Sequence, residues 1–209
     1  MNEKILWYIA DPMCSWCWGF APIVKAMRLN YSKHLRIELV MGGLRPGTEL
    51  AMASEQRAEI LSHWKAVNVR TGQPFSFEGA MPEGFIYDTE PSCRAVVAMA
   101  LINPELVFPL LESIQFSFYV EQKDVTSSRI LAQLVDKIGV DMDSYLQVFE
   151  SNEVKNKVSN HFDKVRRWGV NSFPTVAVQD EAGYSIINRG YCSLGALSQK
   201  LDGWLNIKY

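Results

Sequence analysis

The first 43 residues limit the possible folds most strongly, because they read as a strand, a helix and a second strand. Residues 4–10, KILWYIA, form an almost wholly apolar run, which is typical of a strand buried on both faces. Asp11-Pro12 interrupts this run, and apolar residues at helical spacing follow from Ser15 to about His34. A second strand follows at residues 35–43, LRIELVMGG. Since a crossover of this length joins parallel strands, the sequence predicts an α/β domain.

A helical block separates this unit from the remaining strands. Residues 48–168 carry mainly helical patterns, and the first of these helices is predicted at 49–67. Strand character returns in FPTVAVQ (173–179) and YSIINRG (184–190), which flank a turn and predict an antiparallel hairpin. An amphipathic helix at 194–205 closes the pattern.

This order of elements predicts two structural units. We expect residues 1–47 and 169–209 to form one α/β domain together. We expect residues 48–168 to form a helical domain inserted into it.

Composition and charge argue against several classes of partner. Lys and Arg number 21 against 23 Asp and Glu, so the formal net charge of −2 does not indicate a nucleic-acid or membrane-surface partner. No apolar run approaches the roughly 18 residues that suggest a membrane span. MNEKILWYIAD leaves no room for a secretory signal peptide, so we expect a cytoplasmic protein.

Two cysteines lie between the first predicted strand and the helix, in DPMCSWCWGF. Cys14 falls at or next to the helix N-cap, where unpaired backbone N–H groups and the helix dipole favour a thiolate. Cys17 lies one turn further along, so we expect it to be more buried and less acidic. This asymmetry suits a two-step exchange in which Cys14 attacks and Cys17 resolves.

Three interpretations of the pair compete: a zinc site, a static disulfide and a redox pair. A zinc site needs further ligands at short spacing, whereas Cys93 and Cys192 are isolated and the three His are scattered. A static disulfide is disfavoured in a reducing compartment. Redox chemistry is therefore favoured, and no metal is expected.

Two prolines support the redox interpretation. Pro22 lies inside the predicted helix, where it removes a backbone hydrogen bond. Pro174 precedes the third predicted strand, and a cis Phe173-Pro174 bond would let that loop approach the cysteines.

In combination, these motifs resemble the thioredoxin superfamily. The long helical insertion is similar to that of the DsbA branch. DPMCSWCWGF, TEPSCRAVVA and GVNSFPTVAV resemble the cytosolic FrnE-like DsbA proteins. The resemblance implies a thioredoxin fold with a large all-helical insertion between the second strand and the cis-proline loop.

The resemblance also implies an activity, a thiol-disulfide oxidoreductase that needs no cofactor. Its partners would be protein or peptide thiols and disulfides, with glutathione as a further possible thiol co-substrate. By position, Cys14 would be the nucleophile, Cys17 the resolving thiol and Pro174 the cis-proline.

The same resemblance implies where substrate binds. The backbone of Phe173 would pair with an extended substrate segment, and Trp16 and Ser15 would face the substrate. Ser15-Trp16 lacks the His found in strongly oxidising periplasmic DsbA, so a strongly oxidising character is not implied.

Two other functions stay open. Kappa-class glutathione transferases and 2-hydroxychromene-2-carboxylate isomerases have a similar architecture, bind glutathione and usually carry Ser at the first cysteine position. A non-catalytic chaperone that uses the helical block is the third hypothesis.

Several residues near the motifs admit a plainer interpretation. We expect Cys93 and Cys192 to be small packing residues rather than redox partners. Trp18 is expected in the core rather than at the rim of the site, and Asp11 is expected to cap its loop rather than to carry a proton for Cys17.

Overall fold

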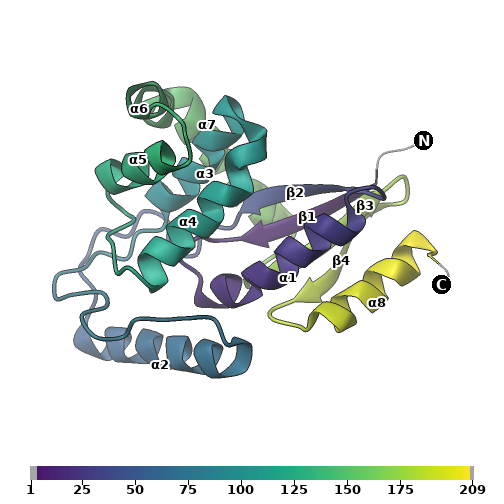
Figure 1. Ribbon diagram of the computed structural model, residues 1–209, viewed down its shortest axis with the longest axis horizontal. Helices are drawn as coiled ribbons and strands as arrows, with labels where there is room; N and C mark the ends of the chain where they lie inside the picture. The colour runs from purple at the N-terminus through teal and green to yellow at the C-terminus, as the bar shows by residue number, and fades with distance from the viewer. Residues whose placement is uncertain (1–3, 208–209) are drawn as a thin grey trace.

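A computed structural model describes residues 4–207, and its centre is a four-stranded sheet in the order β2-β1-β3-β4 (Figure 1). The strands are β1 (Ile5–Ala10), β2 (Arg36–Met41), β3 (Thr175–Asp180) and β4 (Gly183–Arg189). β1 pairs in parallel with β2 and antiparallel with β3, and β3 forms an antiparallel hairpin with β4. The expected parallel pair and the expected hairpin are both confirmed.

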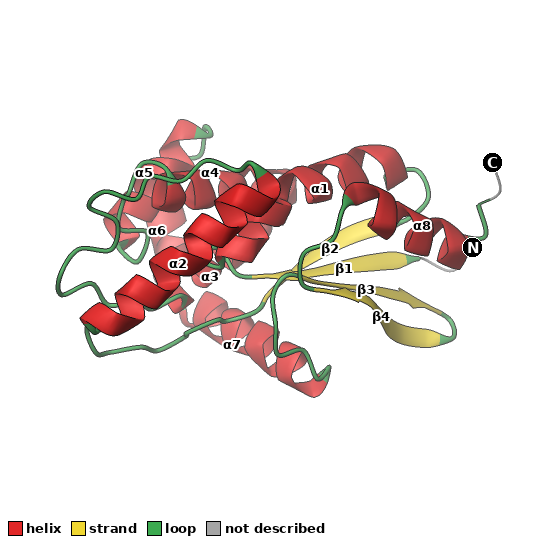
Figure 2. Cartoon of the chain, turned by 90° about the horizontal axis from the view of Figure 1, so that it is seen from below, coloured by secondary structure: helices red, strands yellow, loops and turns green. Residues whose placement is uncertain are grey.

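Alternating side chains on β1 divide the core between the two faces of the sheet. Leu6 and Tyr8 belong to the large apolar cluster shared with α1 (Ser15–Tyr31) and α8 (Leu194–Leu205). Ile9 points the other way and packs with Val165 of α7 (Asn152–Arg167). Figure 2 shows α1 and α8 on one side of the sheet and α7 on the other. The structure is thus an α/β fold with helices on both faces of the sheet, the arrangement that the resemblance to thioredoxins implies.

Helices fill the chain between β2 and β3. Before α7 they are α2 (Ser54–Thr71), α3 (Glu90–Ile102), a 3₁₀ turn (Pro104–Leu106), α4 (Val107–Tyr119), α5 (Ser128–Lys137) and α6 (Met142–Glu150). In Figure 1, α3 to α6 gather to the left of the sheet and α2 lies below them. Within residues 4–207, no helix combines the length and the apolar character needed to cross a lipid bilayer.

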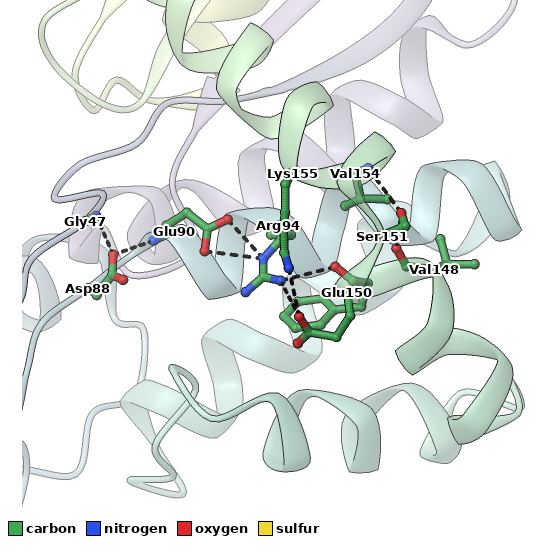
Figure 3. Close-up of polar contacts among 10 residues, drawn as sticks. Gly47, Asp88, Glu90, Arg94, Val148, Glu150, Ser151, Val154 and Lys155 are labelled. Carbon is green, nitrogen blue, oxygen red and sulfur yellow. Dashed lines mark hydrogen bonds and ion pairs between the residues drawn. The ribbon is translucent and has the colours of Figure 1, made fainter.

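Arg94 ties α3 to the junction of α6 and α7 (Figure 3). Its Nε lies 2.9 Å from Glu90 Oε1, and its Nη1 lies 3.2 Å from Glu150 Oε2. The same Nη1 donates to the Phe149 carbonyl at 3.2 Å, and the guanidinium lies 4.0 Å from the centroid of the Phe149 ring. Lys155 adds a second cation on Glu150. Because several groups share Arg94, this junction is more than an isolated surface ion pair.

Pro22 lies inside α1, and a side chain from another segment compensates for it. Proline has no N–H, so the carbonyl four residues earlier, that of Trp18, lacks its helical donor. Gln73 Nε2 donates to this carbonyl at 2.9 Å. The Trp18 indole N–H in turn donates to the Pro74 carbonyl at 2.9 Å. These two bonds fasten the segment after α2 to the first turns of α1.

Candidate active site

Cys14 and Cys17 occupy the beginning of α1, as predicted. Cys14 is the N-cap residue, with extended backbone, and its carbonyl accepts from the N–H groups of Cys17 at 2.9 Å and Trp18 at 3.1 Å. The remaining amides of the first turn and the positive end of the helix dipole therefore lie at Cys14, where negative charge is stabilised.

The two thiols differ in burial, and burial governs the acidity of Cys17. Cys14 is 6% exposed, whereas Cys17 is fully buried at 0%. Burial raises the pKa of the Cys17 thiol well above its usual range, and contact with Cys14 raises it further. The hydroxyl of Tyr8 lies beside Cys17, and burial likewise raises the pKa of Tyr8. Cys17 is accordingly the more protected member of the pair, and its surroundings disfavour its thiolate.

The segment that precedes β3 contacts Cys14 through Phe173. The Phe173-Pro174 peptide bond is cis. The Cys14 thiol donates to the Phe173 carbonyl at 3.6 Å. The Phe173 ring lies against Gly42, where a Cβ atom would come within 2.3 Å of the ring. Glycine at the end of β2 is therefore what allows this close approach.

A pocket of about 270 Å³ opens beside Cys14. Ser15, Trp16 and Phe173, the three residues expected to meet substrate, all lie on its wall. The Trp16 ring also approaches Tyr191, with ring centroids 6.0 Å apart. The structure thus brings the predicted residues together around Cys14.

Further residues of this wall escaped the sequence analysis. They are Arg45 from the segment after β2, Ile60, His63 and Trp64 from α2, and Tyr87 from the segment before α3. They lie far from the cysteines in sequence and share no motif with them. Only tertiary packing shows that they belong to the site.

Asp11 holds the loop that precedes Cys14. Its buried carboxylate accepts from the N–H groups of Met13 at 2.8 Å and Leu44 at 2.7 Å, and from the Cys93 thiol at 3.4 Å. Burial raises the pKa of Asp11. Asp11 therefore caps the loop, as expected, and links it to the segment after β2.

The other two cysteines lie in different surroundings. Cys93 is fully buried, and burial raises the pKa of its thiol well above the usual range. Cys192 is half-buried after β4, and burial raises its pKa as well. All four cysteines are free in the structure.

Two aromatic residues of α1 belong to the core. Trp18 is buried, as expected, and stacks on Tyr119. Phe20 is fully buried against Tyr8. Trp16 alone among the α1 aromatics lies on the pocket wall, in the part of the chain that the structure describes.

Metal ligands do not gather in the described structure. Within residues 4–207, no group of three or more His, Cys, Asp or Glu residues is arranged to hold a metal ion. The Cys14–Cys17 pair accordingly has no described partners that would complete a zinc site.

Comparison with known proteins identifies the family. The family model described as thioredoxin matches residues 7–193. The chain belongs to this family. A crystal structure from Nitrosomonas europaea, of a protein provisionally named a protein disulfide isomerase, superposes with a TM-score of 0.94 and 46% identity over 98% of each chain.

Further solved structures of disulfide oxidoreductases share this fold at lower sequence identity. The cytosolic disulfide reductase DsbM of Pseudomonas aeruginosa matches with a TM-score of 0.76 and 23% identity, over 97% of this chain and 95% of that one. DsbM has also been solved with glutathione. DsbA oxidoreductases of Xylella fastidiosa and N. meningitidis match with TM-scores of 0.63 and 0.61 and share the fold of this chain.

A curated relative is longer than this chain. It is the ClpXP adapter protein SpxH of Halalkalibacterium halodurans, 23% identical over 169 residues. The match covers 79% of this chain and 55% of that protein. The chain thus spans little more than half the length of this relative.

Proposed function

We propose that this protein is a thiol-disulfide oxidoreductase that works through Cys14 and Cys17. The observation that carries the proposal is their asymmetry: Cys14 lies at the N-terminus of α1 on a pocket wall, and Cys17 is fully buried beside it. Nucleophile and resolving thiol need these two environments. The DsbM reductase among the structural neighbours supports the same activity.

The chemistry proceeds as two exchanges. The Cys14 thiolate attacks one sulfur of a substrate disulfide, forms a mixed disulfide and releases the other sulfur as a thiolate. Cys17 then loses its proton and attacks the Cys14 sulfur, which expels the second substrate thiolate and leaves a Cys14–Cys17 disulfide. An electron pair passes from the protein dithiol to the substrate, and a substrate dithiol would drive the same steps backwards.

The environment of Cys17 explains why it reacts only in the second exchange. Negative charge on Cys14 is one of the causes that raise the pKa of Cys17. Formation of the mixed disulfide removes that charge, so Cys17 becomes easier to deprotonate when its attack is required. Before that stage Cys17 stays a thiol.

Substrate would bind along the segment before β3. The backbone of Phe173 would pair with an extended peptide, as in strand addition, next to Pro174. Ser15 and Trp16 would contact the residues that flank the substrate sulfur. We assign the protein to the FrnE-like subgroup on the three motifs quoted above, and to the cytoplasm, where the DsbM relative acts as a reductase.

Insulin reduction by dithiothreitol tests the proposal. The wild-type protein should accelerate precipitation of the insulin B chain, Cys14→Ser should abolish the acceleration, and Cys17→Ser should accumulate mixed disulfides on Cys14. The half-buried Cys192 provides the matched control, since Cys192→Ser should keep wild-type activity. If Cys14→Ser still accelerated precipitation of the insulin B chain, the proposal would be refuted.

Glutathione is proposed as an additional thiol co-substrate, because the DsbM relative has been solved with it. Calorimetry on Cys14→Ser, which cannot form the mixed disulfide, should show saturable binding of reduced glutathione. Heat signals that fail to saturate at millimolar glutathione would remove both this co-substrate and the glutathione-transferase alternative.

A further inference from the structure

The pocket beside Cys14 carries an unbalanced positive charge. Arg45 lies on its wall, and the described residues that form this wall include neither Asp nor Glu. Within residues 4–207, the guanidinium lies over the ring of Tyr87, whose centroid is 5.4 Å away. Asp11 lies behind the wall, fully buried and occupied by its own donors. A guanidinium in this position is available to an anion in the pocket.

The backbone of Arg45 is held in place before any ligand arrives. Its N–H donates to Thr89 Oγ1 at 3.1 Å. Its carbonyl accepts from the Thr89 N–H at 3.3 Å and from Thr48 Oγ1 at 3.0 Å. The side chain is half-buried. Because this segment is already ordered, binding to Arg45 loses less conformational entropy than binding to a mobile surface arginine.

The carboxylate of Asp88, which supports the same segment, is engaged elsewhere. Asp88 Oδ1 accepts from the backbone N–H groups of Gly47 at 2.8 Å and Glu90 at 2.9 Å (Figure 3). These bonds use the carboxylate to brace the Arg45 segment against the start of α3. Within residues 4–207 no carboxylate forms an ion pair with Arg45, so the positive charge on the pocket wall is left for a ligand.

We infer that, among small disulfides, Arg45 makes Cys14 react preferentially with those that carry a carboxylate close to the reacting sulfur. The inference rests on the proposed function, since it concerns the substrate that Cys14 attacks. A guanidinium binds a carboxylate through paired, charge-assisted hydrogen bonds. The pocket of about 270 Å³ lies below the usual range for drug-sized ligands, which favours one half of a small disulfide.

The test uses three small disulfides of similar length and different charge. They are 3,3′-dithiodipropionate, which is anionic, bis(2-hydroxyethyl) disulfide, which is neutral, and cystamine, which is cationic. Reduced Cys17→Ser protein stops after the first exchange, so acid quenching and intact-mass spectrometry give the rate of mixed-disulfide formation on Cys14. Each disulfide is compared only with itself between variants, because leaving thiols of different pKa react at different rates.

Arg45→Gln in this background should slow the reaction with dithiodipropionate by about tenfold, the loss expected for one charge-assisted contact. The reaction with the neutral disulfide should stay within about twofold, and that with cystamine should stay the same or increase. Arg45→Lys should recover part of the lost rate, since it keeps the charge without the paired donors. Arg129→Gln, which removes an exposed charge on α5, should leave all three rates unchanged.

Alkylation of Cys14 by neutral iodoacetamide, measured against pH, separates substrate selection from activation of the thiol. We expect the rate of Cys14 alkylation to depend on pH in the same way whether residue 45 is Arg or Gln. An equal slowing of all three disulfides, with a shifted alkylation profile, would assign Arg45 to the Cys14 thiolate and overturn the inference. The inference would also be overturned if dithiodipropionate formed the mixed disulfide at the same rate with and without Arg45→Gln. If the Cys17→Ser protein with Arg45 intact reacted with none of the disulfides, the proposed function itself would fail.

Discussion

The contact between Gln73 and α1 permits a quantitative prediction about folding. Pro22 leaves the Trp18 carbonyl without its helical donor, and Gln73 Nε2 supplies the replacement at 2.9 Å. Gln73→Ala removes that donor from a carbonyl in a residue that is only 7% exposed. An unsatisfied, partly buried acceptor costs about 1–2 kcal/mol of unfolding free energy.

A double-mutant cycle isolates this contribution. In a Pro22→Ala background the N–H of residue 22 can donate to the Trp18 carbonyl, so Gln73→Ala should then cost less than about 0.5 kcal/mol. The predicted coupling between the two positions is about 1 kcal/mol. Urea unfolding, followed by circular dichroism and tryptophan fluorescence, measures the four proteins under one set of conditions. The exposed Gln199→Ala serves as the control.

The reasoning fails if Gln73→Ala costs the same in both backgrounds. That result would mean that Gln73 acts through contacts other than the Trp18 carbonyl. The reasoning is also contradicted if Gln73→Ala, with Pro22 intact, leaves the unfolding free energy unchanged. The Trp18 carbonyl would then have another hydrogen-bond donor.

Three further predictions concern the surroundings of the cysteines. Gly42→Ala places a Cβ against the Phe173 ring, so it should lower the unfolding free energy by about 1–3 kcal/mol and slow alkylation of Cys14, as urea titration and iodoacetamide kinetics would show. His161 Nδ1 accepts from the Met41 N–H, and burial lowers the pKa of His161 to about 4 from an ordinary 6.5. The unfolded chain then binds a proton that the folded state does not, so stability falls as the pH drops from 6.5 towards 4; at pH 5 the loss relative to pH 7 should be about 1–2 kcal/mol and should be absent in His161→Asn. Cys93→Ala should keep the rate of insulin reduction within about twofold, because that thiol is fully buried; a larger loss would give it a redox role.

The parts of the fold that were predicted from the sequence are those that local patterns determine. The apolar run at the start of the chain correctly predicted β1, and the turn between two β-rich segments correctly predicted the β3–β4 hairpin. The last helix, α8, runs from Leu194 to Leu205 as predicted. Cys14 was correctly placed at a helix N-terminus, because a strand, a break and a helical pattern surround it.

Other parts depend on tertiary contacts that no local pattern shows. The helix expected from residue 49 begins at Ser54, since the Met52 N–H instead donates to the Phe85 carbonyl. Leu29, an apolar residue within the first predicted helix, is 74% exposed, because it falls on the outer face of α1. Arg45 lies on the wall of the candidate site because the irregular segment between β2 and α2 folds against it, and no local pattern predicts that placement.

The division into residues 1–47 plus 169–209 and an insertion at 48–168 stays a prediction. One observation bears on its second boundary. α7, at Asn152–Arg167, covers a face of the sheet through Val165, while α3 to α6 lie to one side (Figure 1). We propose that α7 be counted with the α/β unit that it covers.

The most direct test of the central claim is an equilibrium titration of the cysteines. The protein is equilibrated with glutathione buffers of graded ratio, quenched with acid, alkylated and mapped by mass spectrometry. We expect one two-electron transition in which Cys14 and Cys17 become linked, while Cys93 and Cys192 stay thiols. A pair that stayed reduced in every buffer, or a disulfide that joined Cys14 to Cys93, would contradict the proposal that Cys14 and Cys17 form the working redox pair.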